Sequence, residues 1–546
     1  MTATTTDPTV LKEAARRRTF AIISHPDAGK TTLTEKLLLY GGCVETAGAV
    51  RGRKTQRAAT SDWMELEKQR GISVSSTVLS FEYEGRRINL LDTPGHQDFS
   101  EDTYRTLMAA DCAVMVIDLA KGVETQTKKL FKVCALRGLP ILTFVNKSDR
   151  PGKPTLEVLN DIESELGIEP VPFNWPLGVG FEFRGVVDVS SDMAHLFTST
   201  GGEFRVAYRS APLAELTDQD ASEDTRLHTA EELELLRLAG GTFDSELFLA
   251  GKQTPVFFGS ALNNFGVEHF LRGFLDLCPQ PGSRLSDRGM IEVATPHFAG
   301  FVFKIQANLD PRHRDRVAFV RVCAGRFVRD MEVTHARTGK KIRVPRAHRL
   351  FAQERETMDE AFPGDIVGLV NPGEFRLGDT ICQGTPLNFE PLPEFAPEFF
   401  ATLRCMDTSR RKQFDKGMEQ LIEEGAIQAF QRPGAAKTDM ILAAVGSLQF
   451  DVIRFRLETE YGAKTHLDML PFGFVRWIRS ELTEDQPLKL PYSARRVHDR
   501  HGRPAILFTS QWDVQQCARE NPKVVFSEVG ATGFAGAGSF DQLVSA

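Results

Sequence analysis

In residues 1–282, β-rich apolar runs alternate with helical patterns, and this alternation constrains the fold more than any other feature of the chain. Such a rhythm is typical of a parallel β-sheet wrapped by helices. The strand candidates of that sheet are residues 19–24, 88–92, 112–118, 140–147 and 255–260. We therefore predict an α/β domain over residues 1–282.

A long stretch before the last of these strand candidates breaks the alternation. Residues 149–260 lack the strand-helix rhythm and include an acidic segment over residues 215–234. Connections of this length are uncommon inside a compact domain unless they carry structure of their own. We therefore predict a subdomain inserted at about residues 160–250, in which the acidic segment is a solvated helix.

Proline-rich connectors divide the rest of the chain into two further parts. After the first connector, at residues 279–283, turn signals separate short strand-like runs at residues 300–306, 316–323 and 365–370. This spacing is typical of a small antiparallel barrel, which we predict over residues 290–388. A second connector follows at residues 386–397.

Strands and helices mix in the part that follows the second connector. Strand-like runs at residues 399–404 and 440–445 accompany two amphipathic helices, the second of which Ser447 would cap and Gly462 would end. We predict an α+β domain over residues 396–529 and a flexible tail rich in Gly, Ala and Ser over residues 530–546. The predicted fold class is thus multidomain α/β, with a β-barrel and an α+β domain after the first domain.

The composition is that of an ordinary globular chain. Its 546 residues carry 66 Lys and Arg against 73 Asp and Glu, a formal charge of −7 that gives no sign of a nucleic-acid partner. Its eight cysteines lie far apart without a Cys-x-x-Cys pair, so we expect buried thiols in a reducing compartment. No apolar run reaches the ~18 residues of a membrane span, and the run at residues 20–23 is too short for a signal peptide. We expect a soluble, cytoplasmic protein.

A phosphate-binding loop is the first motif that carries chemistry. It follows a strand, opens a helix over residues 32–40, and reads Ser24-His25-Pro26-Asp27-Ala28-Gly29-Lys30-Thr31-Thr32. In this P-loop, backbone N–H groups and the positive helix end can surround a β-phosphate. Lys30 can reach the β- and γ-oxygens, and the Thr31 hydroxyl can ligate Mg²⁺.

Three further motifs follow in order, each after a strand. The first is Asp92-Thr93-Pro94-Gly95-His96, in which Asp92 can hold Mg²⁺ through water and the Gly95 N–H can meet a γ-phosphate. The second is Asn146-Lys147-Ser148-Asp149: Asp149 can accept two hydrogen bonds from the guanine edge, Asn146 can address the base from the other side and Lys147 can cover the ring. The third, Ser260-Ala261-Leu262, fits a loop whose backbone meets the guanine carbonyl. Together they predict a GTP/GDP site.

A switch segment and a catalytic residue complete this site. Residues 61–73 lie where a hydroxyl closes over Mg²⁺ and the γ-phosphate in GTPases, and Ser73 is the candidate metal ligand. No glutamine follows Gly95, so we hypothesise that His96 orients the attacking water and that Pro26 and Ile72 gate its movement. The alternative is that His96 only forms loop hydrogen bonds.

These motifs, residues 257–262, and further runs at residues 300–319, 362–366 and 445–452 resemble the translational GTPases, and most closely the bacterial class-II peptide chain release factors. The resemblance spans roughly residues 16–525. It explains Ser24 at the start of the loop, because the family has this version. Departures are Ser148, where hydrophobic residues are usual and which should point away from the base, and Ser73, where threonine is common.

The resemblance implies a function in the termination of protein synthesis. Such factors bind the ribosome in a nucleotide-dependent way, drive the departure of the class-I release factor after peptide release, and leave after hydrolysing GTP. The implied partners are the ribosome, both rRNA and ribosomal proteins, and class-I release factors. We expect a monomer that does not bind DNA.

A local excess of basic residues supports an RNA partner. Residues 297–350 hold 13 Lys and Arg against four acidic residues, although the whole chain is acidic. On a small barrel this charge is a footprint for rRNA phosphates, with Arg312, Arg314 and Arg316 as contact candidates. The alternative is a set of scattered solvated side chains.

Two other functions stay open. An elongation factor G-like translocase would carry the same nucleotide motifs, but only about 150 residues follow the second connector, too few for its additional domains. A guanine-nucleotide sensor without useful turnover would not need His96 with a complete Mg²⁺ set. Asp149 disfavours an ATP-dependent kinase.

Overall fold

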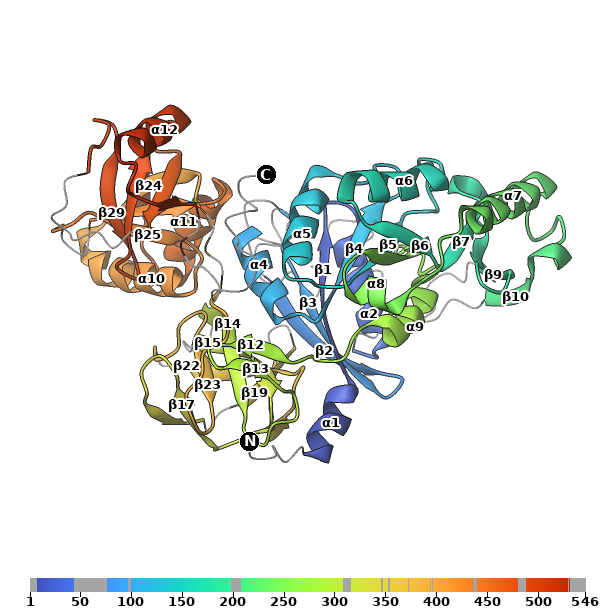
Figure 1. Cartoon of the computed structure of the whole chain (residues 1–546), viewed down its shortest axis with the longest axis horizontal. Helices are drawn as coiled ribbons and strands as arrows, with labels where there is room; N and C mark the ends of the chain where they lie inside the picture. Colours follow the sequence, from blue (N-terminus) through green and yellow to red (C-terminus); the bar gives the residue numbers. More distant parts are fainter. Residues whose placement is uncertain are drawn as a thin grey trace.

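The structure is a computed structural model that describes residues 7–43, 76–96, 100–197, 208–307, 316–344, 347–351, 354–371, 373–392, 394, 396–435, 439–479, 488–528 and 530. Figure 1 shows three parts: a large sheet with its helices, a smaller set of strands below it, and a third sheet at the upper left. The multidomain α/β fold class predicted from the sequence is confirmed.

The first part is a seven-stranded sheet in the order β2-β3-β1-β4-β5-β11-β6. All neighbouring strands are parallel except β2, which runs antiparallel to β3. The sequence predicted five of these strands and missed β2 and β6. The strands are β1 (Arg17–Ser24), β2 (Thr77–Tyr83), β3 (Arg86–Asp92), β4 (Cys112–Asp118), β5 (Ile141–Asn146), β6 (Glu169–Pro172) and β11 (Gln253–Phe258).

Helices cover both faces of this sheet, so its central strands are buried on both sides. All eight residues of β1 are buried, and alternate residues enter different cores. Phe20 and Ile22 belong to the core of α2 and α9, whereas Ala21 and Ile23 belong to the core on the other face. The helices that accompany the sheet are α1 (Pro8–Ala15), α2 (Lys30–Tyr40), α4 (Ser100–Ala109), α5 (Thr125–Leu136), α6 (Thr155–Leu166) and α9 (Val267–Leu277).

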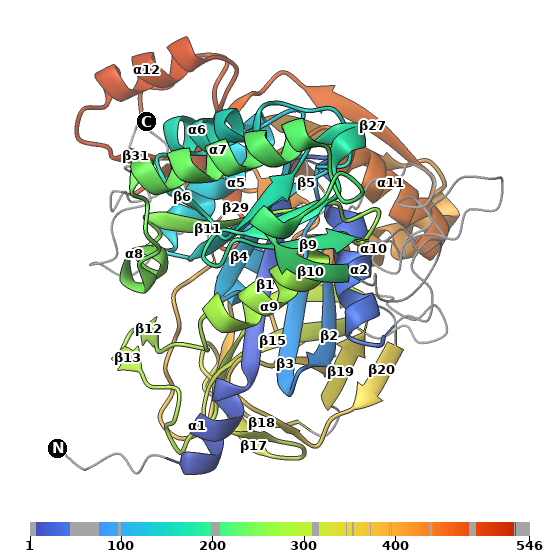
Figure 2. The same ribbon diagram turned by 90° about the vertical axis from the view of Figure 1, so that its right-hand side faces the viewer.

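A separate antiparallel sheet lies between β6 and β11 in the chain, in the order β10-β9-β8-β7. The long helix α7 packs beside it, as Figure 2 shows. The indole of Trp175 on β7 is fully buried and donates to Glu232 Oε2 on α7 at 2.8 Å. The elements are β7 (Asn174–Leu177), β8 (Gly185–Asp188), β9 (Met193–Phe197), β10 (Tyr208–Pro212), α7 (Glu223–Ala239) and α8 (Ser245–Leu249).

The second part is an antiparallel eight-stranded sheet in the order β18-β17-β23-β14-β15-β22-β19-β20. Its side chains enclose one apolar core that includes Val302, Val320 and Ile381. Two short pairs, β12 with β13 and β16 with β21, accompany it. The strands are β12 (Arg284–Ser286), β13 (Gly289–Ile291), β14 (Ala299–Ala307), β15 (Arg316–Ala324), β16 (Phe327–Val328), β17 (Glu332–His335), β18 (Lys341–Arg343), β19 (Ala347–Phe351), β20 (Glu354–Thr357), β21 (Glu360–Ala361), β22 (Ile366–Asn371) and β23 (Thr380–Cys382).

The third part is an eight-stranded sheet in the order β27-β24-β26-β25-β29-β30-β28-β31. Helix α11 begins after Ser447 and ends at Gly462, which has a left-handed conformation. The Ser447 side chain does not cap the helix as predicted; Gln449 Oε1 instead accepts from the N–H of Val445 at 2.8 Å. The elements are β24 (Phe399–Cys405), α10 (Arg411–Glu423), β25 (Gln428–Gln431), β26 (Met440–Ala444), α11 (Leu448–Tyr461), β27 (Thr465–Leu470), β28 (Phe474–Ile478), β29 (Arg495–Asp499), β30 (Pro504–Phe508), α12 (Gln511–Glu520) and β31 (Phe526–Ser527).

One carbonyl group joins the first part to the second part, the unit of β12 to β23 that we call the barrel from here on. The Gly364 oxygen accepts from Thr19 Oγ1 at 2.7 Å, Asn89 Nδ2 at 3.0 Å and Arg321 Nη1 at 2.7 Å. Gly364 has φ +102°, and a Cβ there would lie 2.8 Å from the Arg17 Cβ, so only glycine fits. The barrel is therefore fixed against β1 and β3 by groups that are buried.

All eight cysteines are free thiols. The prediction that they are buried is wrong for Cys43, which is exposed, and Cys405 is half-buried. Among the described residues, no helix combines the length and the apolar character that crossing a bilayer requires.

Candidate active site

The loop between β1 and α2 has the backbone geometry of a phosphate cradle. Gly29, directly before α2, has φ +99°, and a Cβ there would lie 2.2 Å from Asn146 Nδ2. Asp27 is also left-handed, with φ 66°. Because Gly29 has no side chain to cap α2, the first N–H groups of the helix can bind an anion.

Lys30 and Asp92 meet at the carboxyl ends of β1 and β3. The Lys30 ammonium lies 2.5 Å from Asp92 Oδ1, and both side chains are buried. Thr93 Oγ1 donates to the Ile22 carbonyl at 2.5 Å, which fixes the turn after β3 against β1. The structure therefore brings together the first two sequence motifs.

Gly95 and His96 follow on the same turn. A Cβ on Gly95 would lie 3.8 Å from the Pro26 Cα, so this turn lies against the phosphate loop. His96 is half-buried. The switch residues Ile72 and Ser73 lie outside the described residues, and so their predicted functions stay predictions.

Asn146 connects three of the motifs. Its Nδ2 donates to the Ala28 carbonyl at 2.9 Å, and its Oδ1 accepts from the N–H groups of Lys147 and Ala261, both at 2.9 Å. The sequence predicted a contact with the base; the hydrogen bonds in this structure make Asn146 the link between the phosphate loop and the two guanine loops.

Two residues that the sequence analysis did not select support the guanine motif. Asp118, the last residue of β4, accepts from Lys147 Nζ at 2.7 Å, and Lys147 Nζ also donates to the Asp27 carbonyl at 2.6 Å. Asn263 Nδ2 donates to Asp149 Oδ2 at 2.9 Å. Only their positions in the sequence could have indicated these residues. Asp118 lies at the carboxyl end of a predicted strand, and Asn263 directly follows the Ser260-Ala261-Leu262 motif.

The remaining predicted guanine residues differ in exposure. Ser148 is fully buried, and its N–H donates to the Gly259 carbonyl at 3.1 Å. Ser260 and Ala261 are buried, whereas the Leu262 side chain is 43% exposed.

A buried polar cluster joins this site to the barrel. Asp102 on α4 accepts from both the N–H and the hydroxyl of Ser76 at 2.6 Å. Lys304 on β14 donates to the Ser76 carbonyl and lies 3.3 Å from Ser76 Oγ, which Thr106 Oγ1 contacts at 2.8 Å. Burial raises the pKa of Asp102, but the Lys304 charge and the Ser76 hydrogen bonds outweigh it and leave the pKa lowered.

The third part of the chain also contacts α4. Arg105 donates from Nη1 and Nη2 to the Gly425 carbonyl, both at 3.1 Å, and pairs with Glu101 at 2.9 Å. Gly425 has φ +71°, and a Cβ there would lie 2.5 Å from Arg105 Nη1. The helix that follows His96 is therefore held by both later parts of the chain.

The basic residues predicted to contact rRNA are only partly described. Arg312 and Arg314 lie outside the described residues. Arg316 is half-buried and forms an ion pair with Glu423 on α10, which joins the barrel to the third part. The charge of Arg316 is therefore paired within the chain in this structure, and the predicted rRNA contacts of Arg312, Arg314 and Arg316 stay predictions.

Three family models match consecutive parts of the chain. The Elongation factor Tu GTP binding domain matches residues 15–280, Elongation factor G domain 2 matches residues 297–384, and the Class II release factor RF3, C-terminal domain matches residues 389–518. A crystal structure of a protein from Thermus thermophilus shares the fold, with a TM-score of 0.65 at 23% identity over 89% of this chain and 72% of that chain. Together with the phosphate loop and the guanine motif, these matches define a translational GTPase.

Individual relatives identify the family within that class. Peptide chain release factor 3 of Gloeobacter violaceus is 55% identical over 528 residues, which cover 96% of this chain and 99% of the relative. The protein of the same name from Nostoc punctiforme is 54% identical over 94% of this chain and 95% of the relative. The chain belongs to the peptide chain release factor 3 family, GTPases of translation termination. The resemblance seen in the sequence is confirmed, and the elongation factor G-like alternative is not favoured.

Proposed function

We propose that this chain hydrolyses GTP on the ribosome and promotes the dissociation of class-I release factors after peptide release. The observation that carries the proposal is the position of α4. This helix starts four residues after His96; Ser76 links it to Lys304 of the barrel, and Arg105 bonds it to Gly425 of the third part. A nucleotide-dependent movement at Gly95 and His96 would therefore change how the three parts pack, and the ribosome would select one packing.

Mg²⁺ and GTP fit the groups at the head of α2. Asp92 offers a carboxylate that is 3% exposed and already faces a cation, and Thr31 adds a hydroxyl next to Lys30. Oxygen donors of this kind suit Mg²⁺, with Ser73 as the third ligand and Asp92 acting through water. When bound, Mg²⁺ neutralises charge on the phosphate oxygens. Lys30 would exchange its hydrogen bond with Asp92 for one with a phosphate.

His96 would orient the attacking water, and Pro26 with Ile72 would gate its approach. The base would be read by Asp149, which Asn263 holds in place by a 2.9 Å hydrogen bond. Backbone groups of the loop at Ser260, Ala261 and Leu262 would complete the guanine pocket.

We further propose a division into a GTP-binding domain at residues 1–282 with its insert, a barrel at 290–388 and an α+β domain at 396–529. Arg312, Arg314 and Arg316 would contact rRNA, for which Arg316 would exchange its ion pair with Glu423. The protein would act as a cytoplasmic monomer.

GTP turnover with and without ribosomes tests the proposed function. We expect His96→Ala to lower ribosome-stimulated turnover by at least ~100-fold, the range for loss of a residue that positions or moves a proton, with GDP affinity unchanged. His228→Ala is the matched control, because this histidine is 72% exposed on α7. Undiminished turnover for His96→Ala would refute the catalytic role of this residue.

A second assay tests the release step. Recycling of a class-I release factor on post-termination ribosomes is measured with GTP, GDP and a non-hydrolysable analogue. We expect GTP and the analogue to release the class-I factor and GDP not to, with repeated turnover only for GTP. Equal release with GDP would contradict the proposal.

A further inference from the structure

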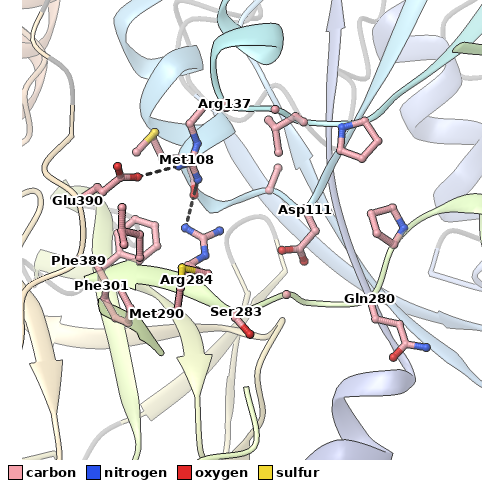
Figure 3. A pocket seen from close by; sticks show the side chains of 17 residues that line it. Met108, Asp111, Arg137, Gln280, Ser283, Arg284, Met290, Phe301, Phe389 and Glu390 are labelled. Atoms are coloured by element: carbon pink, nitrogen blue, oxygen red, sulfur yellow. Dashed lines mark hydrogen bonds and ion pairs between the residues drawn. The ribbon is translucent and has the colours of Figure 1, made fainter. Parts of the chain in front are cut away.

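A cavity of about 380 Å³ lies where the first part of the chain meets the barrel, and its lining includes no residue of the nucleotide motifs. Its walls come from residues 108–111 at the end of α4, from the loop between α5 and β5 at residues 137–140, from the connector at residues 279–285, and from the barrel residues Phe301 and Phe389. Cavities of this size hold small molecules in other proteins. Figure 3 shows that two arginine side chains, Arg137 and Arg284, reach toward each other within it.

The two guanidinium groups share one acceptor. Arg284 Nη1 donates to the Met108 carbonyl at 2.7 Å, and Arg137 Nη2 donates to the same oxygen at 3.3 Å. The Arg284 guanidinium also lies 5.1 Å from the centre of the Phe301 ring. Two like charges are thus brought together beside an apolar wall.

Within the described ranges, the two carboxylates of the cavity pair with other arginines and leave the Arg284 charge without a carboxylate. Asp111 pairs with Arg321 of the barrel at 2.5 Å, and Glu390 lies 3.4 Å from Arg137 Nη1. Among the described residues, Arg284 has no carboxylate partner. A guanidinium has five N–H donors, and the described contacts use only one on Arg284.

Arg137 also has a hydrogen-bond donor that the described residues do not use. Its Nε is buried without a hydrogen-bond partner among the described residues. Burial, and then the nearby charge of Arg284, lower the pKa of Arg137 to about 10. Both observations describe a site in which a negative charge would be stabilised.

We propose that this cavity binds a small organic anion, a carboxylate or phosphate group attached to an apolar ring. The anionic group would accept from Arg284 and from Arg137, in the bidentate geometry that guanidinium groups favour. The ring would lie against Phe301, Phe389 and Met290, which form the apolar side of the cavity.

Because residues of both the first part and the barrel form its walls, a bound anion would also stabilise the packing of the barrel on the first part. Ligands that bind only the folded, packed state stabilise it by RT ln(1 + L/Kd), where L is the free ligand concentration. A bound anion would therefore favour one position of the barrel relative to the first part.

Titration calorimetry on the full chain, saturated with GDP to block the nucleotide site, tests this proposal. The probes are 1-naphthoate and 1-naphthyl phosphate, with the neutral 1-naphthalenemethanol for comparison. We expect one molecule of each anion to bind per chain and the neutral alcohol to bind at least tenfold more weakly. The melting temperature should rise with either anion.

Variants localise the binding. Arg284→Met keeps the apolar stem but removes the charge and should weaken anion binding at least tenfold. Arg288→Met is the matched control, because this exposed arginine donates to the Pro386 carbonyl outside the cavity and should leave binding unchanged. Melting curves of both variants verify that they are folded.

Three outcomes would overturn the proposal. These are no binding of either anion at millimolar concentration, equal binding of the neutral alcohol, or equal anion affinity in Arg284→Met and the parent protein. None of these outcomes bears on GTP turnover, so a failure here is distinguishable from a failure of the proposed function.

Discussion

Substituting Lys304 tests whether the barrel controls the nucleotide site. Lys304 is 5% exposed, donates to the Ser76 carbonyl and lies beside the buried carboxylate of Asp102. Lys304→Met keeps the length of the side chain but removes its charge. The buried Asp102 carboxylate then loses a nearby positive charge, and Ser76 loses a donor directly before β2.

The magnitude follows from the burial of both partners. Removing the Lys304 charge from beside the buried Asp102 carboxylate costs up to ~3 to 5 kcal/mol, the range for a buried charge that loses an opposite charge. Each 1.36 kcal/mol is a factor of ten in an equilibrium constant, so the lower value changes the population of the packed arrangement by about 150-fold. Within the described part of the chain, Lys304 donates to Ser76, which lies outside the nucleotide motifs, and so GDP affinity without ribosomes should change less than about twofold.

The assay compares ribosome-stimulated GTP turnover with GDP binding for the parent, Lys304→Met and Lys341→Met. Lys341 is 73% exposed on the same barrel and pairs with Glu332, which makes it the matched control. We expect Lys304→Met to lose ~100-fold in stimulated turnover and to keep its GDP affinity, and Lys341→Met to keep both. Full turnover in Lys304→Met, below its melting temperature, would refute the reasoning.

Three further predictions follow from single residues. Gly425→Ala should lower the free energy of unfolding by ~2 kcal/mol more than Gly434→Ala in denaturant titrations, because both glycines have φ near +70° but only the first faces Arg105 at 2.5 Å; equal losses would exclude a stabilising contact with α4. Burial, and then the charge of its neighbours His195 and Arg272, lower the pKa of His269 to about 4, so the unfolded chain binds the proton first; stability should fall as the pH drops from 6.5 toward 4, by at most ~3 kcal/mol, and His269→Leu should remove this slope. Asp149→Asn should weaken GDP at least ~100-fold and favour xanthosine diphosphate in competition binding, since an amide can donate to the 2-oxo group of xanthine; unchanged base preference would contradict the role of Asp149.

The strands that the sequence predicted share one property: they are continuous apolar runs buried on both faces, such as β4 and β5. β2 was missed because its polar residues alternate with apolar ones and its hairpin turn is Glu84-Gly85. Both turn residues have positive φ, the geometry of a type I′ turn, although Glu is rarely found there. β6 was missed because two of its four residues are proline, which is typical of an edge strand.

The nucleotide motifs could be located from the sequence because each is short and follows a strand. The cluster of Ser76, Asp102 and Lys304 could not, since it joins residues that are up to 228 positions apart. The ion pair of Arg316 with Glu423 depends likewise on how the barrel packs against the third part. Local sequence patterns can identify a nucleotide-binding loop. Contacts between distant parts of the chain can be identified only from the packed structure.

The hydrogen bonds at the Gly364 carbonyl have a consequence for how this chain folds during its synthesis. Thr19, Asn89 and Asp111 are synthesised well before their partners Gly364 and Arg321; Asp111 precedes Arg321 by 210 positions. Domains usually fold in the order in which they emerge during synthesis. The nascent first part must therefore hold these polar groups in water until the barrel appears, so its final compaction depends on residues that are not yet translated.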